Sequence, residues 1–89
     1  MLGFDSSIDI QISKCKNTRI GILLQRKKGR IAIVARNDQI ENLYVGDFIT
    51  HVNGEKMKDP KKTARKIFSS HPNVTLTIQR HEFTIHLLS

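Results

Sequence analysis

Apolar and polar residues alternate in several short segments of the chain, which is the period of a β-strand with one face on a core. Residues 8–13 and 20–24 show this alternation most clearly. Residues 31–35 are nearly all apolar and mostly β-branched, which suits a strand buried on both faces. The charged residues 25–30 between the second and third segments predict a hairpin loop, with Gly29 available for positive φ.

The same periodicity continues in the second half of the chain. Residues 47–52 and 74–78 predict two further strands, and residues 56–58 are long enough for a brief one. Asn53-Gly54 is a strong turn signal between strands. The polar segment between the expected strands at residues 31–35 and 47–52 has room for one helical turn at most, which we place at residues 38–42.

One segment has the spacing of an amphipathic helix. Asp59-Pro60 opens it, because Asp59 is expected to cap the free amides and proline fits the first helical position. Ala64, Ile67 and Phe68 then follow at helical spacing and predict a narrow buried stripe.

The tail departs from a simple strand. The apolar residues of 74–78 have even numbers, whereas Phe83, Ile85 and Leu87 have odd numbers. One straight strand cannot keep both sets on one face, so a bulge or turn is expected at residues 79–82. The extension at residues 81–89 then forms an extra strand on its own domain, occupies the domain's own groove, or docks on a partner, with weak dimerisation through that edge as one outcome.

Together these elements predict a mainly β fold with one main helix (α+β). We expect a small antiparallel β-barrel or sandwich capped by the helix, with a short first helix. Residues 1–7 are expected to be a tail, residues 8–80 the domain, and residues 81–89 an extension. A lone helix beside a strand leaves a groove that accepts an extended peptide as one more strand.

Composition narrows the class of protein. The chain has 89 residues, 38% hydrophobic and 26% charged, as expected for one small soluble domain. No apolar run approaches the ~20 residues of a membrane helix, and residues 1–7 lack the pattern of a signal peptide. The single cysteine, Cys15, cannot form an internal disulfide, which indicates a reducing, cytoplasmic compartment.

The net charge of +7 indicates an anionic partner: an acidic peptide, a lipid headgroup or a nucleic acid. Aromatic residues are only 6% of the chain and fall mostly at expected core positions, which argues against nucleic acid. No nucleophile–base set or phosphate-binding loop is present, so no enzyme activity and no cofactor are expected. The histidines show no metal-ligand spacing (His51, His71, His81 and His86).

Two motifs resemble the PDZ family. Residues 45–54, VGDFITHVNG, resemble its "vGD-x-I-x-x-VNG" signature, and Leu43 matches the leucine usually found just upstream. Residues 19–22, RIGI, resemble its carboxylate-binding "G-L-G-F" loop. The expected elements follow the order of the animal-type domains, and the resemblance covers about residues 8–80.

The resemblance implies a non-catalytic module that binds the free C-terminal tail of a partner, such as a membrane receptor, a channel or a signalling protein. The loop formed by Arg19, Ile20, Gly21 and Ile22 would bind the terminal carboxylate through backbone amides. A nearby basic residue (Lys14, Lys16 or Arg19) would assist through water. The ligand's last side chain would enter a pocket lined by Ile20, Ile22, Leu24 and Phe68.

The sequence also departs from the family pattern. Arg19 replaces the first glycine of the loop, and a positive φ at this position, if kept, would be less favourable for arginine than for glycine. Aligning the helix by its apolar stripe puts Lys61 and Arg65 at the groove positions. Aligning it by loop length puts Lys62 and Lys66 there instead. Either alignment walls the groove with cations, which favours an acidic third-from-last residue in the ligand.

Lys27, Lys28 and Arg30 form a further cluster, a basic rim expected next to the groove. This rim favours an alternative function. The chain would then be a membrane-surface module that binds anionic phospholipid, such as a phosphoinositide, with weak or no peptide binding. Either function fits a cytoplasmic location, with the inner face of the plasma membrane as its natural site.

Overall fold

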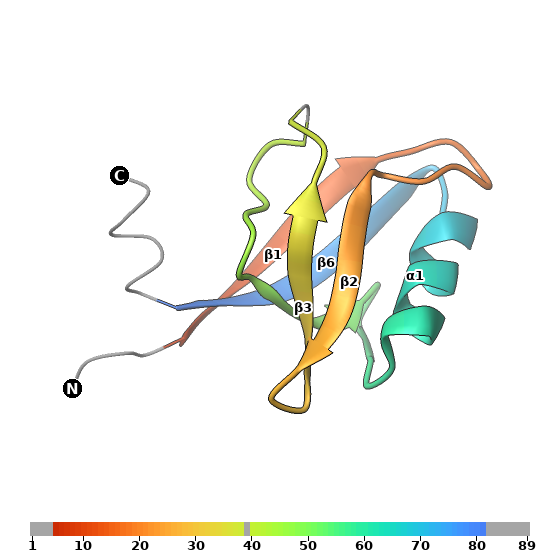
Figure 1. Cartoon of the computed structure of the whole chain (residues 1–89). Helices are drawn as coiled ribbons and strands as arrows, with labels where there is room; N and C mark the ends of the chain where they lie inside the picture. Colours follow the sequence, from red (N-terminus) through yellow and green to blue (C-terminus); the bar gives the residue numbers. More distant parts are fainter. Residues whose placement is uncertain (1–4, 39, 82–89) are drawn as a thin grey trace.

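An open antiparallel sheet packed on one helix makes up the part of the protein described by the computed structural model, residues 5–38 and 40–81 (Figure 1). The sheet has six strands in the order β1-β6-β4-β3-β2, with β5 paired to β4. The strands are β1 (Asp5–Ser13), β2 (Ile22–Lys27), β3 (Arg30–Arg36), β4 (Phe48–Val52), β5 (Glu55–Lys56) and β6 (Asn73–His81), and the helix is α1 (Pro60–Ser69). The predicted mainly β fold with one main helix is confirmed. The sheet is not closed into a barrel, however, because β1 and β2 form its two outer edges.

The first and last strands pair along their whole length. The register runs without a shift from Asp5 opposite His81 to Ser13 opposite Asn73, so β1 begins three residues before the range that we expected. The predicted break in the last strand is absent from residues 79–81, because the ladder with β1 holds them in regular strand conformation. Residue 82 and the alternating tail lie outside the described residues.

Two tight turns join neighbouring strands. The predicted loop at residues 25–30 is shorter than expected, because β2 continues to Lys27 and only Lys28 and Gly29 form the turn. Both turn residues have positive φ (52° and 74°), which matches the right-handed twist of a two-residue hairpin. Asn53 and Gly54 form the second turn in the same way, with φ of 52° and 82°.

The predicted short helix at 38–42 is wrong. The described residues between β3 and β4, 37–38 and 40–47, contain no helix. Asn37 donates its amide to the carbonyl of Gly21 (2.7 Å), and Ile40 donates to Asn37 (3.1 Å), which gives a single turn. The chain then passes through Asn42 at a φ of 68° and buries Leu43 completely. The positive φ of Asn42, directly before the buried Leu43, is incompatible with a right-handed helix at that point.

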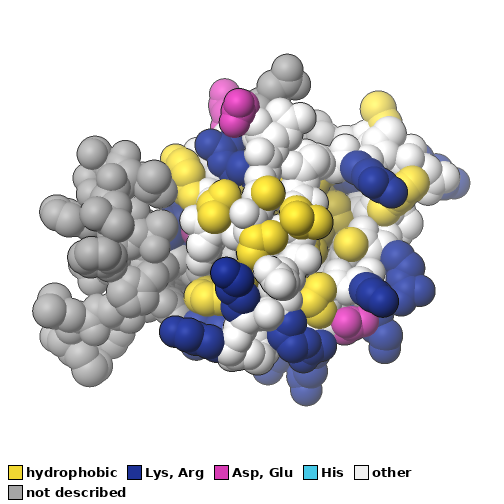
Figure 2. Space-filling view, in the orientation of Figure 1, with side chains coloured by type: hydrophobic (Ala, Val, Ile, Leu, Met, Phe, Trp, Pro, Cys, Tyr) yellow, Lys and Arg dark blue, Asp and Glu magenta, His cyan; other side chains and the backbone are white. Residues whose placement is uncertain are grey.

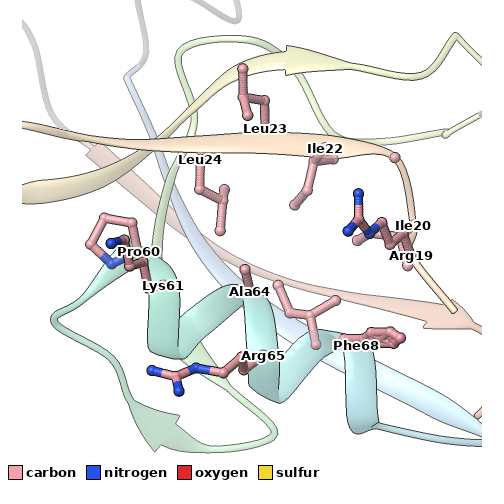
Figure 3. Close-up of a pocket in the computed structure, with 12 residues that line it drawn as sticks. Arg19, Ile20, Ile22, Leu23, Leu24, Pro60, Lys61, Ala64, Arg65 and Phe68 are labelled. Atoms are coloured by element: carbon pink, nitrogen blue, oxygen red, sulfur yellow. The ribbon is translucent and has the colours of Figure 1, made fainter. Parts of the chain in front are cut away.

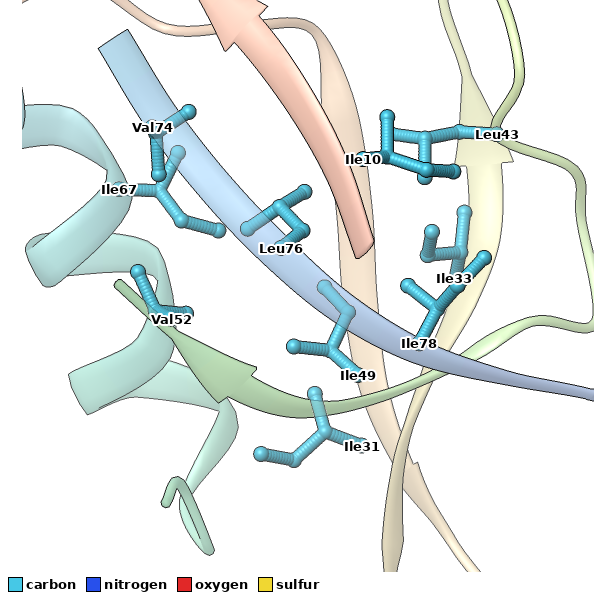
Figure 4. Packing of buried hydrophobic residues seen from close by; sticks show 10 residues of the cluster. All are labelled: Ile10, Ile31, Ile33, Leu43, Ile49, Val52, Ile67, Val74, Leu76 and Ile78. Carbon is cyan, nitrogen blue, oxygen red and sulfur yellow. The ribbon is translucent and has the colours of Figure 1, made fainter. Parts of the chain in front are cut away.

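The core is almost purely aliphatic and lies where β4 and β6 meet β3, β1 and α1 (Figure 4). The expected even-numbered residues of β6 are all in it. Its buried members are Ile10, Ile31, Ile33, Leu43, Ile49, Val52, Ile67, Val74, Leu76 and Ile78.

Helix α1 turns a different face to the core than its apolar stripe predicts. Ile67 is buried, but Ala64 is exposed and Phe68 only half-buried. Thr63 is buried instead, because its hydroxyl donates to the carbonyl of Asp59 (2.8 Å) and needs no water. The helix is therefore rotated so that Ala64 and Phe68 face β2.

The start of the helix is only partly as expected. Pro60 occupies the first helical position, as predicted. Asp59 is the N-cap residue, but its side chain makes no capping hydrogen bond. One of its carboxylate oxygens lies 3.7 Å from the guanidinium of Arg26 on β2, so Asp59 links the helix start to the sheet edge.

One ion pair is buried within the fold. Arg80 of β6 donates from Nε and Nη2 to the two carboxylate oxygens of Asp47 (2.9 and 2.8 Å). Nη2 also donates to the carbonyl of Asn42 (2.8 Å), and the amide of Tyr44 donates to Asp47 (2.9 Å). The residues are 8% and 0% exposed, and Asp47 raises the pKa of the Arg80 guanidinium through these hydrogen bonds. The pair therefore ties the loop before β4 to the last strand.

Replacing Asp47 by alanine is expected to lower the free energy of unfolding by about 3–5 kcal/mol, because it leaves the Arg80 charge buried without a partner. Urea unfolding of the wild type and the variant measures this loss. The double variant D47A/R80M should lose less than the sum of the two single variants. A loss below about 1 kcal/mol for Asp47→Ala would mean that the pair behaves like an exposed one.

Candidate functional site

A groove of about 510 Å³ runs between β2 and α1 (Figure 3). The two elements run in opposite directions. Phe68, near the end of the helix, lies by the loop that precedes β2, whereas Pro60 and Lys61 lie by Leu24 (Figure 3). The groove therefore has a loop end and a helix-start end, and an extended chain laid in it would follow β2.

The loop end is built on Gly21. This residue has a φ of +84°, and its carbonyl accepts a hydrogen bond from the amide of Asn37 (2.7 Å). The loop's other positive-φ residue is Asn17, not Arg19. Arg19 therefore replaces the expected glycine without the unfavourable positive φ that the sequence suggested.

The β2 wall presents a free strand edge to the groove, since β3 is its only partner in the described sheet. Lys27 and Arg30 flank a two-residue turn and so form a hydrogen-bonded pair. Counting back along the ladder, Leu24 is at a position whose N–H and C=O point away from β3. Those groups are available to a strand added in the groove.

The residues predicted to form the apolar pocket come together. Ile20, Ile22 and Leu24 on the β2 side face Phe68 on α1, and all four are half-buried and line the groove (Figure 3). Ala64 also lines the groove on its helix wall, whereas the sequence predicted that it would be part of the core. The rotation of the helix described above explains both observations.

The cations expected at the groove separate into two groups. Lys61 and Arg65, the pair given by the alignment to the apolar stripe, line it, whereas Lys62 and Lys66 do not. Lys66 donates instead to Glu55 (2.8 Å). Figure 3 shows Lys61 beside Pro60 at the helix-start end, while the Arg65 guanidinium points away from β2. Lys61 is therefore the helix cation closest to a bound chain.

Three basic residues, Lys14, Lys16 and Arg19, were expected to assist carboxylate binding. Of these, only Arg19 lines the groove. Lys14 has a different part: its ammonium donates to the carbonyls of Phe68 (3.0 Å) and Cys15 (2.8 Å). It thus fixes the loop to the last turn of α1 and sets the spacing of the two walls. No sequence pattern reveals this role, because Lys14 and Phe68 are distant in the chain.

The residues of the expected basic rim do not line the groove itself. Lys27 and Lys28 lie at the tip of the β2–β3 hairpin, and neither they nor Arg30 line the groove. Arg30 lines a second pocket, between the hairpin and β4.

Within residues 5–38 and 40–81, no group of three or more His, Cys, Asp or Glu side chains is placed to hold a metal ion. No helix in that part of the chain has the length and apolar character needed to cross a membrane. Cys15 is exposed and free.

Comparison with known proteins bears on the fold. No protein-family model matches the sequence, and no curated protein matches it. Among solved structures, the fifth PDZ domain of InaD superposes with a TM-score of 0.68 at 18% sequence identity, covering 84% of this chain and 96% of that one. The fold is PDZ-like. At this identity the likeness concerns the fold alone, and the two sequence motifs fall in the expected places within it.

Replacing Gly21 of the PDZ-like groove by alanine should distort the loop. The new Cβ would lie 2.8 Å from the Cβ of Asn37, at a φ of +84° that side chains rarely adopt. A loss of about 1–3 kcal/mol in the free energy of unfolding is expected, measured by urea denaturation. Gly29→Ala is a matched control, since positive φ remains but a Cβ there has nothing within 4 Å. Equal losses in both variants would show that the contact with Asn37 is unimportant.

Glu55 and Lys66 give a pH-dependent test of the helix position. The hydrogen bond from Lys66, followed by its charge, lowers the pKa of Glu55. The resulting stabilisation is present above the unfolded-state pKa and is lost as the pH falls through the lower folded-state pKa. An NMR titration of the Glu55 carboxyl should therefore have its midpoint below the ordinary glutamate value. Lys66→Met should raise it, and Lys62→Met should not; no change in either variant would contradict the pairing.

Proposed function

We propose that this protein is a non-catalytic interaction module that binds the free C-terminal tail of a partner protein as an added strand between β2 and α1. The observation that carries the proposal is the open edge of β2, which faces a helix across a groove that ends at a glycine loop. Strand addition uses main-chain hydrogen bonds for affinity and side-chain pockets for specificity. The groove supplies both.

The loop end suits a carboxylate. Ile20, Gly21 and Ile22 line the groove there. Backbone amides clustered in such a loop would attract an anion without a charged side chain. The absence of a Cβ at Gly21 lets a ligand approach the backbone closely. Arg19 lines the same end and adds a positive charge. The free C-terminal carboxylate of a peptide is the group that such an anion-binding site would hold.

The strand spacing assigns the ligand's side chains to places in the groove. A last side chain at the level of Ile22 would enter the pocket formed with Ile20 and Phe68. The third-from-last residue lies about 6.6 Å further on, two strand residues away, at the level of Leu24. Lys61 lies at that end, so an acidic third-from-last residue is favoured.

The proposed partners are cytoplasmic tails of membrane receptors, channels or signalling proteins, bound with modest affinity because a short groove buries little area. We place the module in the cytoplasm, near the membrane that carries such tails. Anionic phospholipid binding with little peptide binding is the competing function, and it does not depend on a free carboxylate.

The proposal is tested by titrating ¹⁵N-labelled protein with a pool of free-acid C-terminal peptides and with the same peptides amidated. Only the free acids are expected to shift the amide signals of Ile20, Gly21 and Ile22, because amidation removes the charge that the loop binds. If these signals stay still with every peptide, the groove does not bind chain termini and the proposal is wrong.

The charge preference has its own test. Lys61→Gln should weaken binding of a peptide with an acidic third-from-last residue about 1.5- to 5-fold, the range for an exposed ion pair. A peptide with serine at that place should bind the variant and the wild type equally. Lys62→Gln removes the same charge outside the groove and serves as the control, measured by the same titration. Equal weakening by both substitutions would assign the effect to overall charge.

A further inference from the structure

A second pocket, of about 550 Å³, lies between the β2–β3 hairpin, β4 and β5. It shares no lining residue with the groove. Its position under the hairpin places it on a surface to which the proposed peptide-binding function assigns no role. We call it the basic pocket, after the side chains that line it (Arg26, Arg30, His51, Lys56 and Lys58).

The basic pocket collects cations from separate parts of the chain. Arg26 comes from β2 and Arg30 from β3, while Lys56 ends β5 and Lys58 precedes α1. In the part of the chain that the structure describes, no Asp or Glu lines the pocket, although Asp59 lies next to Arg26 at its border. Four positively charged residues from four segments line this one pocket, which favours an anionic occupant.

The four cations differ in whether they already interact with other side chains of the protein. Arg26 lies 3.7 Å from Asp59, and the Arg30 guanidinium lies 5.1 Å from the centre of the Phe48 ring. Lys56 and Lys58 are exposed and have no ion-pair partner among the residues whose side chains the structure describes, 7–38 and 40–80. An anion can therefore bind these two lysines without first breaking an existing ion pair.

The floor of the basic pocket indicates what kind of anion fits. It contains Ile31, Phe48 and Ile49, and β3 and β4, which carry them, each have a strand neighbour on both sides. The floor thus offers no free strand edge to a peptide. A compact anion with several charges, such as a phosphorylated sugar headgroup, engages dispersed cations without needing backbone partners.

The surroundings extend the positive charge beyond the pocket. Lys27 and Lys28 lie at the tip of the same hairpin, and Lys and Arg side chains gather along the lower edge of the molecule, where that hairpin lies (Figure 2). A flat anionic surface would contact the hairpin tip while one headgroup entered the pocket. The charge distribution therefore favours a membrane as the source of the anion over a free solute.

We propose that the basic pocket binds the phosphorylated headgroup of an anionic membrane lipid, with Lys56 and Lys58 as its principal contacts. The hairpin lysines supply additional attraction to the surrounding surface. This site is independent of the peptide groove, and it places the groove on a domain held at a membrane.

The test uses phosphatidylcholine vesicles that contain phosphatidylinositol bisphosphate, compared with vesicles in which phosphatidylserine supplies the same surface charge. Wild-type protein is expected to co-sediment preferentially with the former. The variant K56Q/K58Q should bind those vesicles at least about tenfold more weakly, because each lysine near an anionic surface contributes strongly to binding. Circular dichroism of the variant shows whether it is folded.

A matched control removes the same charge elsewhere. Lys16 and Lys62 are exposed and line neither pocket, so K16Q/K62Q reproduces the loss of two positive charges without touching the site. It should weaken vesicle binding about threefold or less, since distant charges are screened by salt. Equal losses in the two variants would overturn the proposal, because they would reduce binding to general charge attraction.

A titration of ¹⁵N-labelled protein with soluble inositol trisphosphate separates the possible sources of the anion. Shifts in the amides of Lys56, Met57 and Lys58, without shifts at Gly21, would support a phosphate site in the basic pocket. The same shifts without any preference for the phosphoinositide vesicles would support the phosphate site but overturn the membrane as its source. No shift at residues 56–58 would overturn the site itself. None of these readings depends on peptide binding in the groove.

Discussion

The buried pair between Asp47 and Arg80 holds together the parts of the fold that have no regular structure to support them. Burying two charges costs free energy unless every polar atom finds a partner. Here the carboxylate takes two hydrogen bonds from the guanidinium and one from the amide of Tyr44, and the guanidinium also reaches the carbonyl of Asn42. The backbone of residues 46–47 then bonds to Ile33 of β3 in both directions. The pair thus connects the last strand to β3, on which the groove strand β2 depends.

The groove stays open because its two walls are supported from different sides. β2 is held by β3, and α1 is anchored through Thr63 and Ile67 on the other side. Two contacts bridge them, one at each end: Lys14 to the last turn of the helix, and Arg26 to Asp59 before its first turn. Ile20, Ile22, Leu24 and Phe68 between the bridges remain half-buried, which is the state of a surface that a further chain can cover.

Local signals in the sequence predicted the features that depend on neighbouring residues. The turns at Gly29 and Asn53-Gly54, the start of the helix at Pro60 and the buried face of β6 follow from turn chemistry and from periods of two and 3.6 residues. Errors arose where a tertiary contact overrode the local preference. Thr63 is buried and its hydroxyl bonds back to the helix start, and the described residues of 38–42 are not helical, with Asn42 at positive φ and Leu43 drawn into the core. The basic pocket could not be predicted, since its cations meet only when β2, β3 and β5 are assembled.

The order of the sheet has a consequence for how the chain folds. Among the described strands β6 comes last in the chain, yet it lies between β4 and β1 (Asp5–Ser13), which comes first. Nearly all of residues 5–81 must therefore have been synthesised before the central ladder can form. Until then β1 has no strand to pair with, and the aliphatic side chains of β4 lack half of their cover. Such non-local pairing has a high loop-closure cost, so the domain should fold late and cooperatively, and more slowly than a helical protein of equal length.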